Sequence, residues 1–201
     1  MHAREFVVKG MEILKTAEPL AKRLNPLSKR YRDLVGTVDA LRKEILTQQL
    51  LLQGQRRPTP LGIALVGPPG IGKSGLINLI LGIVSHIQGR TFEDTHVYTK
   101  PATTDYFEGY EPYSHPFLHL SEVGSKKKER VLKNGDPEID LLCTLIDSLP
   151  AQVDMAFEGK GRTPALFEAV IIDTNNPGMN IDAAVSNPAA VLRRFIFLAP
   201  S

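Results

Sequence analysis

Apolar residues in the first quarter of the chain recur at helical spacing. From Leu27 on they fall alternately four and three positions apart, on one stripe of a helix: Leu27, Tyr31, Leu34, Val38, Leu41 and Ile45. The same period fits a short coiled-coil seam, but the heptads are too few to separate the two readings, so we favour a helix that packs within its own domain. Residues 1–25 are also predicted to be helical, with interruptions at Gly10 and Pro19, and Pro26 is expected to start the second helix or end the first.

The pattern changes after a segment rich in Gly and Pro at residues 54–60, which we interpret as a linker. We therefore expect a helical N-terminal extension over residues 1–57 and a second domain over residues 58–201. In the second domain, short apolar runs predict strands at 61–66, 117–123, 169–173 and 195–198, and helices are expected at 73–85 and 139–149. This alternation predicts an α/β fold with a mainly parallel sheet flanked by helices.

Composition narrows the class of protein. The chain has 201 residues, of which 42% are hydrophobic and 23% charged, enough for one core of moderate size. It has no run of about 18 apolar residues and no signal-peptide pattern, so we expect a protein that is not secreted. Cys143 is its single cysteine, which excludes an internal disulfide framework and a cysteine-rich zinc site.

Positive charge is concentrated in the N-terminal part. Residues 1–57 hold 12 Lys and Arg against 6 Asp and Glu, whereas the remaining residues hold 12 against 16. A basic helical segment can meet nucleic acid or an anionic membrane surface, but a solvated helical face is the commoner explanation. Both readings stay open at this point.

A phosphate-binding loop lies between the first predicted strand and the helix that follows it. The motif G-x-x-x-x-G-K-[ST] is matched by Gly67, Pro68, Pro69, Gly70, Ile71, Gly72, Lys73 and Ser74. Glycines let the backbone turn its N–H groups toward a phosphate at the N-terminus of a helix. Lys73 is expected to reach the β- and γ-phosphates and Ser74 to bind Mg²⁺. The predicted ligand is ATP, or another nucleoside triphosphate, with Mg²⁺.

The loop alone does not identify the reaction, because kinases, GTPases and helicases all use one. Five further pieces follow it in order: an aromatic segment D-Y-F-E-G-Y at 105–110, the strand F-L-H-L-S-E at 117–122, M-A-F-E-G-K-G at 155–161, I-I-D-T-N at 171–175, and the pair Arg193-Arg194 before Phe195. Together they resemble a superfamily 3 helicase, most closely the membrane-associated NTPase of picorna-like positive-strand RNA viruses. The segment at 117–122 takes the Walker B place and the segment at 171–175 resembles motif C.

The resemblance implies a P-loop NTPase of AAA+ type and a role for each matching residue. Glu122 is the expected catalytic carboxylate, which would also serve the metal, and Asn175 the sensor of the γ-phosphate, beside the catalytic Lys73. Arg193 and Arg194 resemble arginine fingers that reach the next subunit's nucleotide, which implies a homo-oligomeric ring, a hexamer. Two further residues, Lys160 and Arg162, lie on a loop expected to face the pore and grip RNA phosphates.

One position departs from the family pattern. The family usually ends the Walker B strand with two acidic residues, whereas this chain has Ser121-Glu122. Either Glu122 alone suffices for the metal site and hydrolysis, or the chain binds nucleotide and hydrolyses it slowly. Asp173 is a neighbouring carboxylate, but the sequence does not show that it compensates for the missing acidic residue. The basic run at 126–130 is interpreted either as an RNA contact or as a solvated loop.

The expected function is therefore ATP hydrolysis coupled to unwinding or remodelling RNA during viral RNA replication, as part of a replicase polyprotein. The alternative is a membrane- or protein-associated scaffold that is switched by nucleotide; a small-molecule kinase is disfavoured by Asn175 and the arginine pair. We expect the host cell cytoplasm, with membrane-bound replication sites, as the location. The family usually continues beyond the position of Ser201, so the resemblance also implies a domain truncated at its C-terminus.

Overall fold

The computed structural model describes residues 3–53, 55–101, 104–156, 161 and 163–200. The chain divides into two compact units, Met1–Gln55 and Arg56–Ser201. Within the described residues, no helix is both long and apolar enough to cross a membrane.

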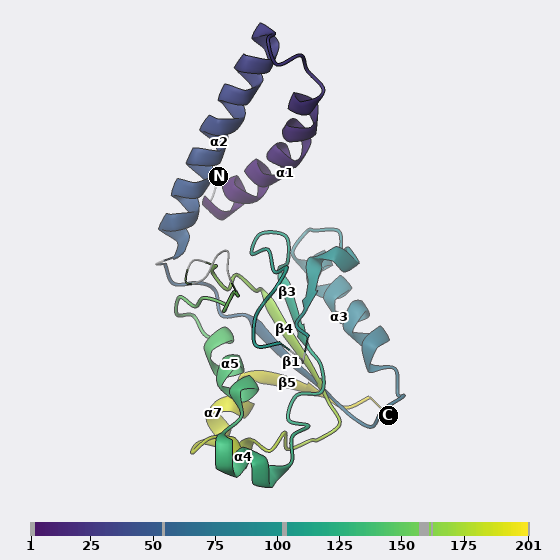
Figure 1. Cartoon of the computed structure of the whole chain (residues 1–201). Helices are drawn as coiled ribbons and strands as arrows, with labels where there is room; N and C mark the ends of the chain where they lie inside the picture. Colours follow the sequence, from purple (N-terminus) through teal and green to yellow (C-terminus); the bar gives the residue numbers. More distant parts are fainter. Residues whose placement is uncertain (1–2, 54, 102–103, 157–160, 162, 201) are drawn as a thin grey trace. The chain divides into compact units, whose positions relative to one another are not determined.

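The first unit is a hairpin of two helices, α1 (Ala3–Lys22) and α2 (Lys29–Gln53), which lie side by side and antiparallel (Figure 1). Val38 and Ile45, from the apolar stripe of α2, are buried, as is Val7 on α1. The stripe is therefore used for packing inside the unit, as the favoured reading of the sequence expected.

The predicted interruptions of the first helix are wrong, because α1 runs through both Gly10 and Pro19. At Gly10 a Cβ atom would lie 2.7 Å from Cδ1 of Ile45, so glycine is what allows α1 to approach α2 closely. Pro19 removes one backbone donor near the end of the helix, and the packing of α1 on α2 outweighs that loss. Pro26 lies in the connection between the helices.

The second unit is built on a parallel five-stranded sheet in the order β2-β3-β4-β1-β5. Its strands are β1 (Leu61–Val66), β2 (Val97–Thr99), β3 (Phe117–Leu120), β4 (Ala169–Thr174) and β5 (Phe195–Leu198). The α/β fold with a parallel sheet flanked by helices is thus confirmed. The order places β4 between β1 and β3, so the strands that carry the P-loop and the Walker B segment do not touch each other directly.

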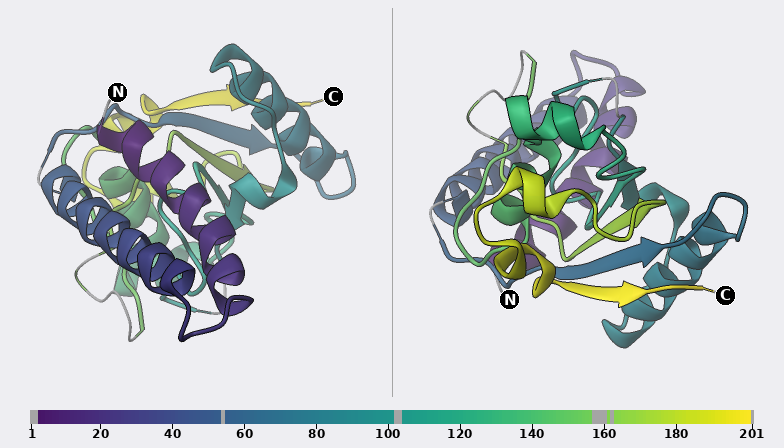
Figure 2. Two further views of the ribbon diagram at one scale, coloured as in Figure 1. Left: turned by 90° about the horizontal axis from the view of Figure 1, so that it is seen from above. Right: turned by 90° about the horizontal axis from the view of Figure 1, so that it is seen from below.

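Helices cover both faces of this sheet (Figures 1 and 2). They are α3 (Lys73–Ile87), α4 (Lys128–Asn134), α5 (Pro137–Leu145), α6 (Ile181–Ala184) and α7 (Pro188–Leu192), with a short 3₁₀ turn at Asp94–His96. On one face Leu81 of α3 packs against Leu65 of β1. On the other, Leu142 of α5 and Val191 of α7 share a larger core with Ile172 of β4.

The structure differs from the sequence interpretation at two places after β3. The strand expected at 117–123 ends at Leu120, because Glu122 has a positive φ of 56° that an extended strand does not accommodate. The basic run at 126–130, for which a solvated loop was one interpretation, instead leads into α4, whose single buried residue is Val131.

Arg57, inside the segment interpreted as a linker, is bonded into the second unit. Its guanidinium donates hydrogen bonds of 2.7–2.9 Å to four backbone carbonyls, those of Thr144, Leu145, Leu149 and Ala165. Two of these carbonyls end α5, where a positive charge also complements the helix dipole. Burial lowers the pKa of the Arg57 guanidinium below its ordinary value.

We expect Arg57→Ala to reduce the free energy of unfolding of the second unit by about 2–4 kcal/mol, because charged hydrogen bonds are lost and carbonyls lose their partner. Denaturant unfolding of the whole chain measures this change. The neighbouring Arg56→Ala is the matched control, since Arg56 is exposed and its removal should change stability by less than about 0.5 kcal/mol. Equal effects of the two substitutions would contradict the assigned role.

Candidate functional site

The P-loop has the backbone conformation that its glycines permit. Gly70 and Gly72 have positive φ angles of 86° and 83°, which residues with a side chain rarely adopt. Gly72 is the N-cap of α3, so the loop ends where backbone N–H groups at the start of a helix are free to bind an anion. Ser74 is exposed in the first turn of the same helix.

Lys73 connects the P-loop to motif C. Its ammonium donates hydrogen bonds to the carbonyl oxygens of Gly67 at 2.6 Å and Pro68 at 3.0 Å, and to Oδ1 of Asn175 at 2.7 Å. Lys73 is buried, and Asn175 lies 102 positions later in the chain. The three oxygens that hold this ammonium belong to neutral groups, so an anionic ligand can take their place.

Backbone hydrogen bonds join three segments at the carboxyl edge of the sheet. Gly67 N–H donates to the carbonyl of Thr174 at 3.1 Å, which fixes the start of the P-loop to the end of β4. Val123 N–H donates to the carbonyl of Asp173 at 3.1 Å, which fixes the segment after β3 to the same strand. The P-loop, motif C and the Walker B segment therefore meet at one edge.

Glu122 lies in this meeting place, exposed, and with a left-handed backbone. A non-glycine residue in this conformation is strained, and such residues persist where their surroundings hold them. Thr174 supplies part of that support by donating its hydroxyl to the carbonyl of Val123 at 2.7 Å. Gly124 supplies another part: a Cβ there would lie 2.5 Å from Cα of Met179, so only glycine allows the close approach.

A polar cluster lies beside Glu122; its members Ser121 and Asp173 were singled out from the sequence, but His119 was not. Asp173 Oδ1 is 2.7 Å from His119 Nε2, and Asp173 Oδ2 accepts a long 3.5 Å hydrogen bond from the Ser121 hydroxyl. Burial raises the pKa of Asp173, but the contacts with His119, Ser121 and the backbone N–H of Glu122 outweigh it, so its pKa is lowered overall. The sequence signal was present, since Asp173 stands in motif C and Ser121 was singled out.

The two arginines lie at the opposite edge. Phe195 pairs with Gly62 near the start of β1, so Arg193 and Arg194 precede the amino end of β5, away from the P-loop of their own chain. Arg194 donates to the carbonyls of Ile146 and Ala190 and lies 3.5 Å from the carboxylate of Asp147. Arg193 is exposed. The structure therefore brings Lys73, Asn175 and Glu122 to one edge of the sheet and leaves the arginines elsewhere.

Two other predicted elements have different outcomes. Lys160 and Arg162 fall outside the described residues, so their expected RNA contacts stay predictions.

In the aromatic segment, Phe107 and Tyr110 are buried, and both rings pack against Tyr98 of β2. These aromatics belong to the core of the second unit.

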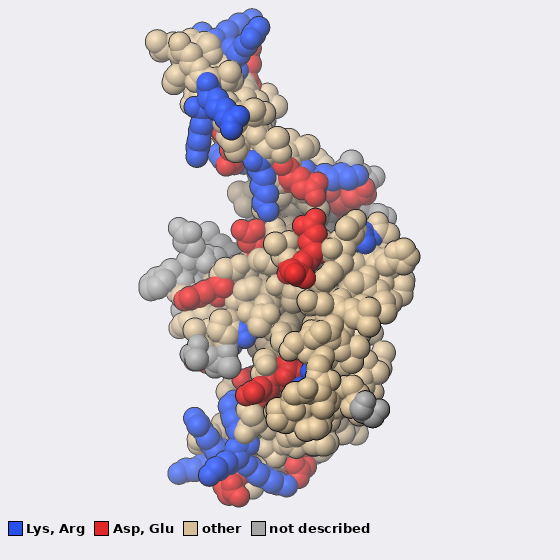
Figure 3. All heavy atoms as spheres, turned by 90° about the vertical axis from the view of Figure 1, so that its right-hand side faces the viewer, with Lys and Arg blue, Asp and Glu red and all other residues tan. Residues whose placement is uncertain are grey.

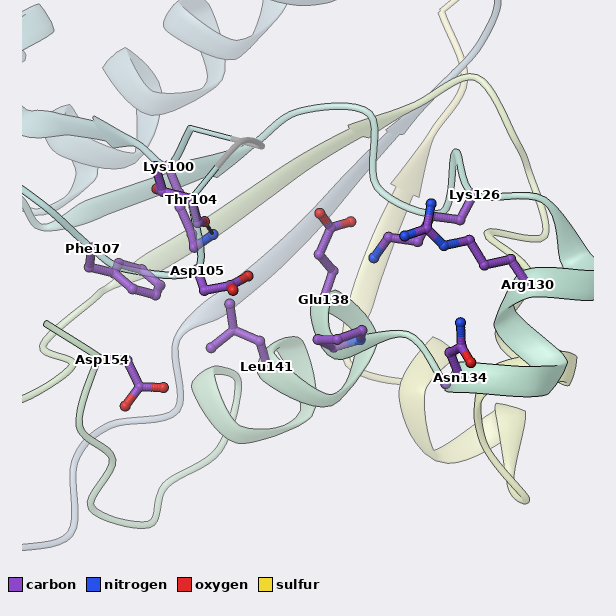
Figure 4. A pocket seen from close by; sticks show the side chains of 12 residues that line it. Lys100, Thr104, Asp105, Phe107, Lys126, Arg130, Asn134, Glu138, Leu141 and Asp154 are labelled. Atoms are coloured by element: carbon purple, nitrogen blue, oxygen red, sulfur yellow. Dashed lines mark hydrogen bonds between the residues drawn. The ribbon is translucent and has the colours of Figure 1, made fainter. Parts of the chain in front are cut away.

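A cavity of about 590 Å³ lies apart from the P-loop, between the segment before Phe107 and helices α4 and α5 (Figure 4). Glu138 projects into it between Asp105 on one side and Lys126 with Arg130 on the other. Burial raises the pKa of Glu138, and Lys126 partly opposes this. Because its lining mixes both signs of charge, the cavity does not select an anion such as a nucleotide.

Basic side chains gather over α4 on the surface (Figure 3). Lys127, Arg130 and Lys133 are exposed, and Lys128 pairs with Asp182 at 2.5 Å. Exposed positive charges attract phosphates over a distance of about one Debye length, about 10 Å at 0.1 M ionic strength.

The residues at the carboxyl edge fit Mg²⁺ and a nucleoside triphosphate. The P-loop offers turned backbone, Lys73 offers a cation without a carboxylate partner in the described contacts, and Ser74 offers a hydroxyl. Within the described residues, no group of three or more His, Cys, Asp or Glu side chains is placed to hold a metal ion by itself. In NTP sites Mg²⁺ is held by few protein oxygens together with phosphates and water.

Comparison with known proteins identifies the family. No curated protein matches the chain. Residues 63–176 match the protein-family model described as RNA helicase, which covers more than half of the chain and includes the P-loop, the Walker B segment and motif C but not the arginine pair. The chain thus belongs to the RNA helicase family, the superfamily 3 helicase domain of small RNA viruses.

Proposed function

We propose that this protein hydrolyses ATP with Mg²⁺ and uses the energy to unwind or remodel RNA during viral RNA replication in the host cell cytoplasm. The observation that carries the proposal is the hydrogen bond between Lys73 of the P-loop and Asn175 of motif C, at the edge where Glu122 also lies. A cation can stabilise charge on the γ-phosphate, a polar amide can contact it, and a carboxylate can orient the attacking water.

Each of these residues has a distinct task in the proposed reaction. Bound Mg²⁺ would neutralise charge on the β- and γ-phosphates, with Ser74 as its protein hydroxyl ligand. Lys73 would exchange its carbonyl contacts for phosphate oxygens, because an anionic phosphate oxygen is a stronger acceptor for an ammonium than a neutral carbonyl oxygen. Asn175 would then be released to contact the γ-phosphate or the attacking water. Glu122 would orient that water and accept its proton.

The family also supports RNA binding and oligomeric assembly. We propose an AAA+-type ring, a hexamer, in which Arg193 reaches the nucleotide of the neighbouring subunit. The supporting observation is its position: Arg193 is exposed and precedes the amino end of β5, far from its own P-loop. Arg194 would instead brace its own subunit through Asp147 and the Ile146 carbonyl.

Mixing variants separates these two roles. We expect Arg193→Ala to lower turnover by about 10³-fold, the lower value for loss of an arginine finger, without a change in unfolding midpoint. Mixing Arg193→Ala with Glu122→Gln subunits should restore part of the activity, since some interfaces regain both groups. Arg194→Ala should lower the midpoint by several degrees, as a loss of about 1 kcal/mol does. No recovery on mixing would contradict a finger that acts between subunits.

An RNA-unwinding assay distinguishes the helicase proposal from the alternative of a nucleotide-switched scaffold. ATP-dependent strand separation of an RNA duplex by the wild-type chain, absent in Lys73→Ala, is the expected result. ATP-dependent flotation with anionic liposomes, without strand separation, would support the membrane-associated scaffold and overturn the helicase proposal.

A further inference from the structure

We propose that Asp173, at the end of β4, provides the carboxylate that the magnesium site lacks at Ser121, in addition to Glu122. The inference rests on the proposed NTPase function and names a residue that takes part in it. Four features of the structure support it.

The first feature is strand register. His119 pairs with Ile171 and Leu120 with Ile172, so the next residues, Ser121 and Asp173, follow side by side on neighbouring strands. Neighbouring strands lie about 4.8 Å apart, so a carboxylate at position 121 and a carboxylate at position 173 can reach nearly the same metal position. The proposed carboxylate therefore lies at the end of β4 instead of at the end of the neighbouring strand β3.

The displacement is toward the nucleotide. On its other side Asp173 pairs with Leu65 of β1, and β1 leads directly into the P-loop. Ser121 follows β3, one strand further from β1. A carboxylate on β4 is therefore closer in the sheet order to the P-loop than a carboxylate at Ser121 would be.

The third feature is the face of the sheet. Side chains alternate along a strand, so Asp173 shares the face of Ile171, as Ser121 shares the face of Phe117. Ile171 and Phe117 both belong to the apolar cluster that α3 covers. Ser74, the expected metal ligand, is in the first turn of that same helix.

The fourth feature is how the carboxylate is held. His119 lies 2.7 Å from Oδ1, and Oδ2 accepts a long 3.5 Å hydrogen bond from the Ser121 hydroxyl. A carboxylate has about four acceptor sites, so these contacts and the one with the backbone N–H of Glu122 leave capacity for a metal-bound water. Second-shell bonds of this kind orient carboxylates at metal sites.

The test measures the Mg²⁺ concentration that half-saturates binding of a fluorescent ATP analogue to the whole chain. We expect Asp173→Asn and Asp173→Ser to raise this concentration about 10- to 100-fold, the usual effect of removing a group that supports a metal. The double variant Ser121→Asp with Asp173→Ser returns one carboxylate to the neighbouring strand. It should recover to within about threefold of the wild type, because the two positions are coupled.

The controls make the outcomes separable. Asp182→Asn removes an exposed carboxylate on α6 and should leave the half-saturating concentration within about twofold of the wild type. Binding of the analogue without Mg²⁺ and the unfolding midpoint report whether each variant is folded, and Mn²⁺ binding followed by electron paramagnetic resonance gives a second readout independent of hydrolysis.

Two results would overturn the inference alone. In one, the wild type binds the analogue with Mg²⁺ and both Asp173 variants behave within about twofold of it. In the other, the variants lose Mg²⁺ dependence and the double variant, although folded, recovers none, which would assign Asp173 a purely structural pairing with His119. A wild-type chain that binds no nucleotide with or without Mg²⁺ would instead overturn the proposed function itself.

Discussion

Lys73→Ala is expected to weaken ATP binding by about 100-fold or more, because hydrogen bonds from a charged group contribute about 1.5–3 kcal/mol each and Lys73 is expected to make more than one to the phosphates. In the structure its ammonium is already buried among Gly67, Pro68 and Asn175, so it does not have to be recruited from solvent. Equilibrium titration with a fluorescent ATP analogue measures the loss.

Lys133→Ala is the matched control for this substitution. Lys133 is an exposed lysine on α4, and its removal should leave affinity within about twofold of the wild type. Unchanged affinity in Lys73→Ala, with the chain still folded, would show that the P-loop does not hold the triphosphate.

Glu122→Gln is expected to separate binding from chemistry. Loss of a general base lowers turnover by about 10²–10⁴-fold, whereas the neutral amide has the same shape and should leave nucleotide affinity nearly unchanged. The left-handed backbone at Glu122 is held by Thr174 and Gly124, so the substituted side chain should keep its position. Single-turnover release of phosphate, beside the binding titration, measures both quantities.

Glu129→Gln, on the exposed first turn of α4, is the control carboxylate and should leave turnover unchanged. A Glu122→Gln variant that hydrolyses ATP at the wild-type rate would transfer the role of base to another group.

Local features of this fold were readable from the sequence. The P-loop was predicted because its conformation depends on glycines at fixed spacing. The strand β1 was predicted from a short apolar run, and the helix α3 from apolar residues that suit a helix buried on one side. The apolar residues that each of these elements buries are close together in the sequence, so the pattern shows within a short segment. The strand at β2 was missed because three residues, Val97–Thr99, are too few for a period to show.

Features that depend on contacts between distant segments were not readable. Arg57 looked like part of a linker because its four carbonyl partners lie 87–108 positions away. Gly10 looked like a break because its contact with Ile45 requires the second helix. The meeting of Ser121 with Asp173 depends on β4 lying between β1 and β3, an order that the succession of strands along the chain does not specify.

The arginine pair shows the limit of a motif read without structure. Both residues matched the resemblance equally well, but the structure bonds Arg194 to Ile146, Ala190 and Asp147 of its own chain and leaves Arg193 exposed. A sequence motif names the residue types, and only the fold shows which of them is available to a neighbouring subunit.

The central claim is tested most directly by steady-state phosphate release from ATP, measured on the wild-type chain with and without single-stranded RNA and beside Lys73→Ala. We expect Mg²⁺-dependent turnover that rises when RNA is added and disappears in the variant. Turnover by Lys73→Ala equal to that of the wild type, or a folded wild-type chain that binds ATP and releases no phosphate with RNA present, would contradict it.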